Sequence, residues 1–369
     1  MPRKTLSKST CNVMLLSLTV SLSAMSQAAP LINSVNDSKI IQGGTYFNTP
    51  NSKTNFINSH SDGLWLKSGV TIRGLEVTPN HNLTNNGGTI QLYAPGQVVR
   101  VDGNINVNGL TSGQGAYLDN GGKVLVNSAY LYQNGNILAG GNRGGQVNMN
   151  VNSASFGPQA KIDASSPNGI GESICINASG VVDIQRGAVL TTSGLHIPGI
   201  DSNLIEVAGR VVNNDGIINA NGITANASVQ NMTASSGGII RLTANSGNLN
   251  LQPVEKALAG GGVFNSSERT GILDRLQGLA KNSPNSAQST GSITANERVS
   301  TSPAMSMGGN GGVISILAAK NATLSGNISA SKNLTVSAGQ DIAIDPLETF
   351  KLSTNRMLKK PGNTVKLAC

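Results

Sequence analysis

The feature that most constrains the fold of this chain is a loose repeat that opens on a Gly-Gly pair. Clear copies begin at Gly87-Gly88, Gly121-Gly122 and Gly144-Gly145, and weaker ones begin near Gly171, Gly237 and Gly311. A period of about 20–25 residues is the mark of a solenoid, in which each repeat is one short unit stacked on its neighbours. The chain is therefore predicted to form an elongated body with extended surfaces rather than a globule around a deep pocket.

Within each repeat, apolar and polar residues alternate. Residues 147–152 read Val-Asn-Met-Asn-Val-Asn, and similar pairs recur in every copy. A period of two indicates half-buried strands, and one repeat is too short to hold a helix as well. The sequence therefore predicts an all-β fold, a right-handed parallel β-helix, because parallel crossovers are almost always right-handed. In this arrangement the segment Ile105–Val107 of the first clear repeat lies near Ile137 of the second and Ile162 of the third.

The composition suits a narrow aliphatic core. The chain has 369 residues, with 45 glycines and only 3% aromatic residues. Val, Ile, Leu and Ala can fill the inside of each coil, while Gly and Asn serve the turns. Asn can act through turn chemistry alone, or its side chains can stack and hydrogen-bond along the axis. Both interpretations of the asparagines remain open from the sequence.

Residues 1–29 have the pattern of a secretory signal peptide. A basic start is followed by an apolar run from Val13 to Met25 and by small residues before Pro30. Cleavage is expected after Ala28 or Ala29. The alternative, a membrane anchor, is disfavoured because the run is too short to span a bilayer. The mature chain is expected to have no transmembrane span and to be secreted or displayed on the cell surface.

The net charge of +8 arises at the two ends of the chain. The signal peptide and the segment after Phe350 together hold eight of the 26 basic residues and no acidic residue. The remaining 18 basic residues equal the 18 acidic ones. Because the central body is balanced, the high pI does not indicate a nucleic-acid partner.

Two regions interrupt the repeat. An aromatic-rich segment before the first clear copy is predicted to cap the solenoid. Near the C-terminal end, Asn265 and Glu268 have the spacing of a helix capping box, and a helical stripe runs from Ile272 to Leu279, followed by a polar, loop-like stretch at 282–307. The predicted divisions are a signal peptide (1–29), an N-terminal cap region (30–86), a β-helix (87–252), an insertion or loop (253–310), a β-helix continuation (311–345) and a basic C-terminal tail (346–369).

The signal peptide, the Gly-Gly-led coils and two stretches resemble the filamentous-haemagglutinin-like exoproteins of Gram-negative bacteria. The two stretches are residues 87–109 (GGTIQLYAPGQVVRVDGNINVNG) and residues 43–69 (GGTYFNTPNSKTNFINSHSDGLWLKSG). The resemblance covers most of residues 40–345 and implies export through an outer-membrane partner pore, as in two-partner secretion, and a role as an adhesin. The secretion domain of that family usually carries an Asn-Pro-Asn-Leu motif, where this chain has only Thr49-Pro50-Asn51 and Thr78-Pro79-Asn80. The chain is also short for such an adhesin, so we expect either a truncated member of the family or a small secreted one.

The search for chemistry yields candidates but no clear site. A β-helical polysaccharide lyase or glycoside hydrolase would need carboxylates on adjacent coils. Asp102 and Asp163 occupy roughly similar repeat positions, and the three histidines lack metal-ligand spacing. Cys175 is expected to be a buried structural thiol. The candidate acids are Asp102, Asp119, Asp163, Asp183 and Asp215, and the histidines are His60, His81 and His196.

Two functions from different classes therefore remain. The first, which we favour, is a non-catalytic adhesion or structural factor that binds host cells, matrix or polysaccharide through its extended surface. No catalytic, cofactor-binding or metal-binding residue is assigned, and no cofactor is expected. The second is the polysaccharide lyase or glycoside hydrolase, which a cluster of acids on one face of adjacent coils would favour.

Overall fold

The structure is a computed structural model. It describes residues 63–76, 84–110, 119–167, 169–194, 203–222, 237–260, 262–296 and 312–344, and outside these ranges only the backbone of strands within 34–58, at Val77 and Leu83, and at 364–368. The predicted signal peptide lies outside the described residues.

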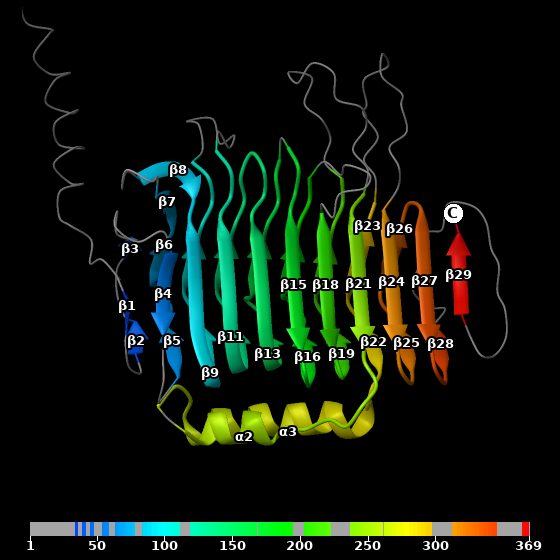
Figure 1. The fold of residues 1–369 in the computed structure, drawn as a ribbon. Helices are drawn as coiled ribbons and strands as arrows, with labels where there is room; N and C mark the ends of the chain where they lie inside the picture. The colour runs from blue at the N-terminus through cyan, green and yellow to red at the C-terminus, as the bar shows by residue number, and fades with distance from the viewer. Residues whose placement is uncertain are drawn as a thin grey trace, which may run out of the picture.

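The described strands wind into successive coils, and each coil contributes strands to three faces of a parallel β-solenoid (Figure 1). We call these faces the front, lower and rear faces, by their places in Figure 1. The front and lower faces belong to one 18-stranded sheet, because three long strands run through both, and the rear face is a 9-stranded sheet. An all-β, parallel solenoid is therefore confirmed.

The long strands shared by the front and lower faces are β9 (Thr89–Val101), β11 (Lys123–Gln133) and β13 (Gln146–Phe156). The front face also contains β1 (Ser34–Val35), β4 (Thr54–Asn58), β15 (Ser173–Ala178), β18 (Leu204–Gly209), β21 (Ile239–Ala244), β24 (Val313–Ala318) and β27 (Asn333–Ala338). The lower face also contains β2 (Lys39–Ile41), β5 (Leu64–Leu66), β16 (Val181–Ile184), β19 (Val211–Asn214), β22 (Ala287–Ser289), β25 (Ala322–Leu324) and β28 (Ile342–Ile344). The rear face contains β3 (Thr45–Phe47), β6 (Thr71–Arg73), β10 (Asn104–Asn106), β12 (Asn136–Leu138), β14 (Lys161–Asp163), β17 (Val189–Thr191), β20 (Ile217–Asn219), β23 (Ser292–Ala295) and β26 (Ile328–Ala330).

Aliphatic side chains stack in register inside the coils. Ile105 pairs with Ile137, and Ile137 pairs with Ile162, as the sequence predicted. On the front face, Ile240 lies between Ile205 and Ile314, and all three are fully buried. These inward positions thus contact aliphatic residues about 4.8 Å above and below. The last inward ladder of the lower face is mixed and includes Gln133, Phe156 and Asn214, so the core is one continuous, mostly aliphatic column.

The Gly-Gly pairs allow successive coils to approach closely at a corner. A Cβ on Gly122 would collide with the carbonyl oxygen of Gly88, and one on Gly145 would collide with that of Gly122. Neither glycine has a positive φ. The pairs are therefore explained by the lack of a side chain and not by a left-handed backbone.

Asparagine side chains hydrogen-bond from coil to coil. The Asn86 Oδ1 accepts a bond from the backbone N–H of Asn120 at 3.0 Å, and Asn120 Oδ1 accepts one from Arg143 N–H at 3.2 Å. On the rear face Asn136 Nδ2 donates to Asn104 Oδ1 at 2.7 Å. Axial amide bonding, one of the two open interpretations, is thus present alongside turn chemistry.

The solenoid extends beyond the predicted β-helix on the N-terminal side. Strands within 34–73, in the predicted cap region 30–86, pair in parallel with the coils that follow, for example β4 with β9 and β6 with β10. An antiparallel hairpin of β7 (Leu75–Val77) and β8 (Leu83–Gly87) then projects from the coil. In the predicted tail, β29 (Thr364–Ala368) pairs antiparallel with β27.

A helical arm, residues 245–286, leaves the solenoid after β21 and returns at β22. It contains α2 (Gln252–Ala259), which packs on β9, β11 and β13, and α3 (Ser266–Asn282), which packs on β16 and β19. Both helices therefore lie along the lower face (Figure 1). The predicted capping box is confirmed, because Asn265 Oδ1 accepts a bond from Glu268 N–H and Glu268 Oε2 accepts one from Asn265 N–H, each at 2.9 Å.

The boundaries of the arm differ from those of the predicted insertion, 253–310. Residues 287–295, which we interpreted as part of a polar loop, form β22 and β23 and pair in parallel with β19 and β20. Their small and hydroxylated residues masked the alternation that marks strands elsewhere. Helix α2, with Pro253 in its first turn, was not predicted, although proline at that position is a helix-start signal.

The register predicts which substitutions the core tolerates. Ile240→Asp places a carboxylate without a cation in the aliphatic column, and we expect a loss of more than about 3 kcal/mol. Thr243→Asp lies on the outward side of the same strand and should cost less than about 1 kcal/mol. Thermal unfolding followed by circular dichroism compares the two, and equal shifts in melting temperature would contradict the inward and outward assignments.

Candidate functional site

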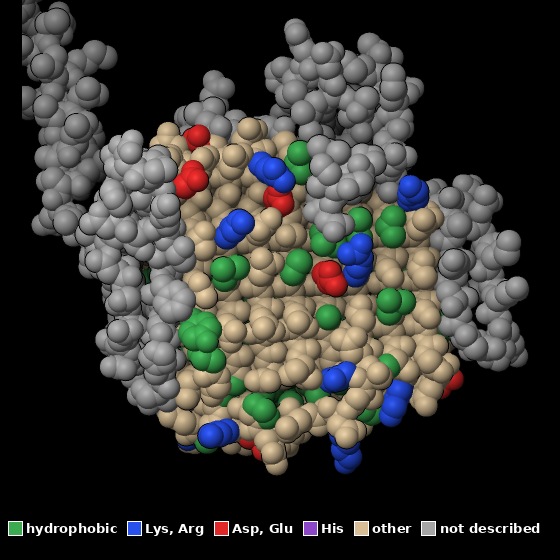
Figure 2. All heavy atoms as spheres, viewed as in Figure 1, with side chains coloured by type: hydrophobic (Ala, Val, Ile, Leu, Met, Phe, Trp, Pro, Cys, Tyr) green, Lys and Arg blue, Asp and Glu red, His purple; other side chains and the backbone are tan. Residues whose placement is uncertain are grey.

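The front face presents three outward ladders of mostly uncharged polar side chains. The middle ladder runs through Gln91, Leu125, Asn148 and Cys175 and continues to the pair Glu206 and Arg241. Among the described outward positions of the front-face strands, from β9 to β27, the charged residues are Lys123, Glu206 and Arg241. Figure 2 shows the result, a broad surface with isolated charged side chains and no single-sign patch in its described part.

A shallow groove crosses the front face over several coils. Two adjoining hollows of about 360 and 330 Å³ share the side chains of Asn127, Asn150 and Asn177. These asparagines occupy one register position on β11, β13 and β15, so their amides follow one another at the coil spacing of about 4.8 Å. Arg210 and Asn245 border one end. The groove offers repeated hydrogen-bond donors and acceptors to an extended polar partner.

Cys175 corrects a sequence prediction. It is half-buried and lies on the outward side of β15, because Ile174 and Ile176 take the inward positions. We expected a buried structural thiol, but the alternation of the strand places this residue among the groove residues.

The lower face has a different character and is covered by the arm. Its outward positions include Val98, Tyr130, Val181 and Val211, which form a second apolar cluster with Phe264 and other arm residues. Exposing so many apolar side chains to water would be unfavourable, at roughly 25 cal/mol per Å². The arm is therefore part of the folded body, not a loose insertion.

An arginine cluster anchors the beginning of α3. Arg100 on β9 contacts Asp102 (Nε to Oδ2, 2.6 Å) and Glu268 (Nη1 to Oε1, 3.0 Å). Its guanidinium also lies 4.5 Å from the ring centre of Trp65 and 4.8 Å from that of Phe264. Such planar stacking with two ion pairs is typical of arginine and fixes the arm over the early coils.

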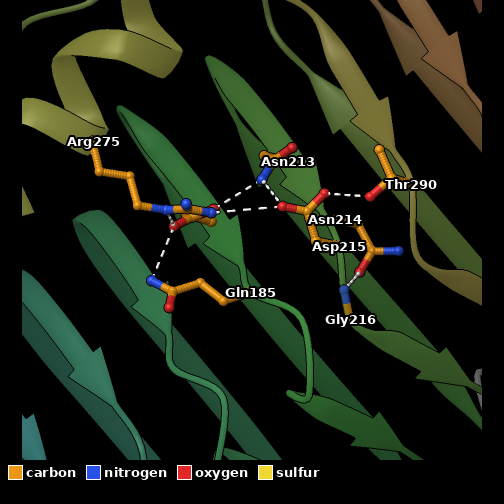
Figure 3. A network of polar contacts seen from close by, with 8 residues as sticks. Gln185, Asn213, Asn214, Asp215, Gly216, Arg275 and Thr290 are labelled. Carbon is orange, nitrogen blue, oxygen red and sulfur yellow. Dashed lines mark hydrogen bonds and ion pairs between the residues drawn. The ribbon is translucent and has the colours of Figure 1, made fainter.

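A second anchor lies near the middle of α3 and is drawn in Figure 3. Arg275 binds Asp183 on β16, with Nη2 to Oδ1 at 2.9 Å and a further contact from Nε. It also lies 3.6 Å from Asp215, and Asn213 Nδ2 bridges the two carboxylates at 2.9 and 3.1 Å. The pKa of Arg275 is raised, and its hydrogen bond to Asp183 is the largest cause.

The structure brings only some of the predicted acids together. Asp183 and Asp215 lie on neighbouring coils and share Arg275. Asp102 belongs to the Arg100 cluster at the end of the lower face, whereas Asp163 lies on the rear face and pairs with Lys161 at 3.2 Å. The predicted similarity of Asp102 and Asp163 is therefore wrong, because Asp102 follows the lower-face end of β9 whereas Asp163 ends β14 on the rear face. Asp119 precedes β11, where its backbone carbonyl accepts a bond from Asn142 at 2.8 Å.

Two tyrosines under the arm have raised pKa values. Burial is the main cause for Tyr130, which is fully buried, and also for half-buried Tyr132, where Asp102 adds to the effect. The Tyr130 hydroxyl makes no well-formed hydrogen bond, although Ser155 lies near enough to offset part of the increase. Both phenols therefore stay protonated at neutral pH.

Comparisons with family models, with curated proteins and with solved structures found no match for this chain. Among the described residues, no group of His, Cys, Asp and Glu side chains is arranged to hold a metal ion. His60, His81 and His196 lie outside the described residues. Within the described part of the chain, no helix has the length and apolar character needed to cross a membrane.

The Arg275 anchor predicts a measurable dependence of stability on one side chain. Arg275→Ala leaves the carboxylate of Asp183, which is 0% exposed, without its cation. We expect a loss on the order of 2 kcal/mol, less than for a fully buried pair, because Arg275 is 43% exposed. Adding Asp183→Asn should restore part of the melting temperature. If the double variant melts below Arg275→Ala, the carboxylate is not the source of the loss.

The buried tyrosine predicts a loss of stability at alkaline pH. The raised pKa of folded Tyr130 gives the fold a stability contribution that is fully present below about pH 10, the pKa of an unfolded tyrosine. This contribution is lost as the pH rises above about 10 and through the pKa of the folded state. Tyr130→Phe should therefore lose less stability than the parent protein as the pH rises from about 10 to about 12. At pH 7 it should melt at or above the parent temperature, because an unpartnered hydroxyl is removed. Urea unfolding midpoints measured across this pH range test the prediction. Equal declines with pH in the parent and in Tyr130→Phe would refute this role of Tyr130.

Proposed function

We propose that the mature chain is a non-catalytic adhesion or structural factor of a Gram-negative bacterium, secreted or displayed on the cell surface. The observation that carries the proposal is the front face. It combines ladders of uncharged polar side chains with the amide groove of Asn127, Asn150 and Asn177. A regular polar surface of this kind suits many weak contacts whose effects multiply along a host-cell, matrix or polysaccharide surface.

The proposal includes the finer architecture and the route of export. The solenoid is taken to be a right-handed β-helix, as parallel crossovers favour. Residues 1–29 direct the chain out of the cytoplasm, and an outer-membrane partner pore exports it, in the manner of the filamentous-haemagglutinin-like exoproteins that the sequence resembles. The long run of parallel coils and the Gly-Gly corners support this kinship.

A polysaccharide lyase or glycoside hydrolase is the second candidate. Asp183 and Asp215 favour it, since they are carboxylates on adjacent coils. Their surroundings argue against catalysis, because both are held by Arg275 and Asn213, and Asp183 is fully buried. A catalytic carboxylate must reach the glycosidic bond or its attacking water.

Binding of the purified mature protein to epithelial cells and to immobilised matrix tests the proposal. Asn150→Lys together with Asn177→Lys adds two charges to the exposed groove without touching the core. We expect binding to fall by about tenfold or more, because contacts repeated along the groove are lost together. Thr323→Lys together with Ala343→Lys, at two exposed and register-paired strand positions of the lower face, is the matched control and should bind like the parent.

Equal binding by the groove variant and the parent would reject the front face as the contact surface. Incubation with acidic and neutral polysaccharides provides the second arm of the test. New reducing ends or unsaturated uronides that disappear in Asp183→Asn or Asp215→Asn would favour the enzyme instead.

A further inference from the structure

A cleft of about 240 Å³ lies between α3 and the lower face. Two small residues among its larger lining residues, one on the sheet and one on the helix, leave room for it. On the outward ladder Trp65, Arg100, Tyr132, Ser155, Asp183 and Asn213, the smallest side chain is that of Ser155. On the helix side, Gly271 lines the cleft, and a Cβ added there would meet no atom within 4 Å. The arm is thus held against the lower face by the Arg100 and Arg275 anchors, and the cleft lies between these two anchors.

The charges around the cleft are already compensated. Arg100 and Arg275 line it, and each binds two carboxylates, Asp102 and Glu268 for the first and Asp183 and Asp215 for the second. Of these carboxylates only that of Glu268 lines the cleft. An anion would meet guanidinium groups that already bind two carboxylates each, while a cation would meet two guanidinium groups at the wall. An uncharged ligand avoids both costs.

The remaining lining combines apolar surfaces with hydrogen-bonding groups. Tyr132 and Phe264 meet edge to face, with ring centres 5.8 Å apart, and Ile272 adds an aliphatic surface. Ser155 and Gln185 supply a hydroxyl and an amide on the sheet side. A ligand that matches this lining has an apolar face and hydroxyl groups around its edge.

We propose that the cleft is a binding site for one uncharged sugar ring. A pyranose has C–H faces that pack on aromatic and aliphatic side chains, and its hydroxyls donate and accept hydrogen bonds. The volume lies below the ~300–1,000 Å³ of sites for drug-sized molecules, which limits the ligand to about one ring. The site lies on a different face from the amide groove and does not depend on the proposed adhesive function.

The test uses the mature full-length chain and a panel of free monosaccharides. Glucose, galactose, mannose, N-acetylglucosamine and N-acetylgalactosamine are the neutral probes, with glucuronic acid and glucosamine as charged comparators. Saturation-transfer NMR and titration should give a roughly millimolar Kd for at least one neutral sugar. Absence of binding by all the neutral sugars, or tighter binding of a charged comparator, would overturn the proposal.

Two glycines of α3 provide a matched pair of variants. Gly271→Leu fills the mouth of the cleft, whereas Gly278→Leu lies on the same helix, also has open space around it, and does not line the cleft. Both should keep or raise stability, since leucine favours a helix by about 0.8 kcal/mol over glycine. We expect the Kd to rise at least about tenfold in Gly271→Leu and to stay unchanged in Gly278→Leu.

A variant on the sheet side of the cleft tests whether the effect of Gly271→Leu comes from filling the cleft and not from a change in α3 alone. Ser155→Val fills the cleft from β13 and should weaken sugar binding as Gly271→Leu does. The groove variant Asn150→Lys with Asn177→Lys should keep its sugar affinity, which separates this site from the front face. Equal affinities in the parent, Gly271→Leu and Ser155→Val would show that the sugar binds elsewhere and would refute the site.

Discussion

The in-register stacking of inward aliphatic side chains is the constraint on which the rest of the structure depends. A single coil cannot enclose a core, so each one is stabilised by the backbone hydrogen bonds and aliphatic contacts of its neighbours. The stack at Ile105, Ile137 and Ile162 illustrates this, because all three are fully buried and paired in sequence order. The Gly-Gly corners follow from the same constraint, since side chains there would separate the coils.

This stacking also determines what the outer surfaces can be. Every outward position becomes part of a ladder that runs along the axis, so one choice of residue type in the repeat is multiplied over many coils. On the front face the outward residues are mostly amides and hydroxyls, which leaves the surface open to solvent and partners. On the lower face several outward residues are valine or tyrosine, and the arm covers them. The two faces therefore offer different chemistry, a groove between polar ladders on one and a cleft beside the arm on the other.

The arm connects distant coils through two arginine-centred anchors. Arg100 on an early coil binds Glu268 at the start of α3, and Asp183, three coils further on, binds Arg275. Each anchor includes one carboxylate that is largely removed from water, Asp102 at 13% exposed and Asp183 at 0%, so breaking either anchor leaves a poorly solvated charge without its cation. The space between them is set by the small residues Ser155 and Gly271, which makes the cleft a property of both the sheet and the helix.

The sequence by itself determined the all-β class, the parallel solenoid, the stacking partners of Ile105 and the capping box of α3, because these depend on local alternation and short spacings. It did not identify β22, β23 or α2, where small and polar residues weaken the pattern. Only the tertiary structure decided which carboxylates meet: Asp183 and Asp215 come together, while Asp102 and Asp163 lie on different faces. The contact between Arg275 and Asp183 joins residues 92 positions apart. Such a pairing depends on where the arm folds back along the solenoid, and no periodicity within a single repeat encodes that path.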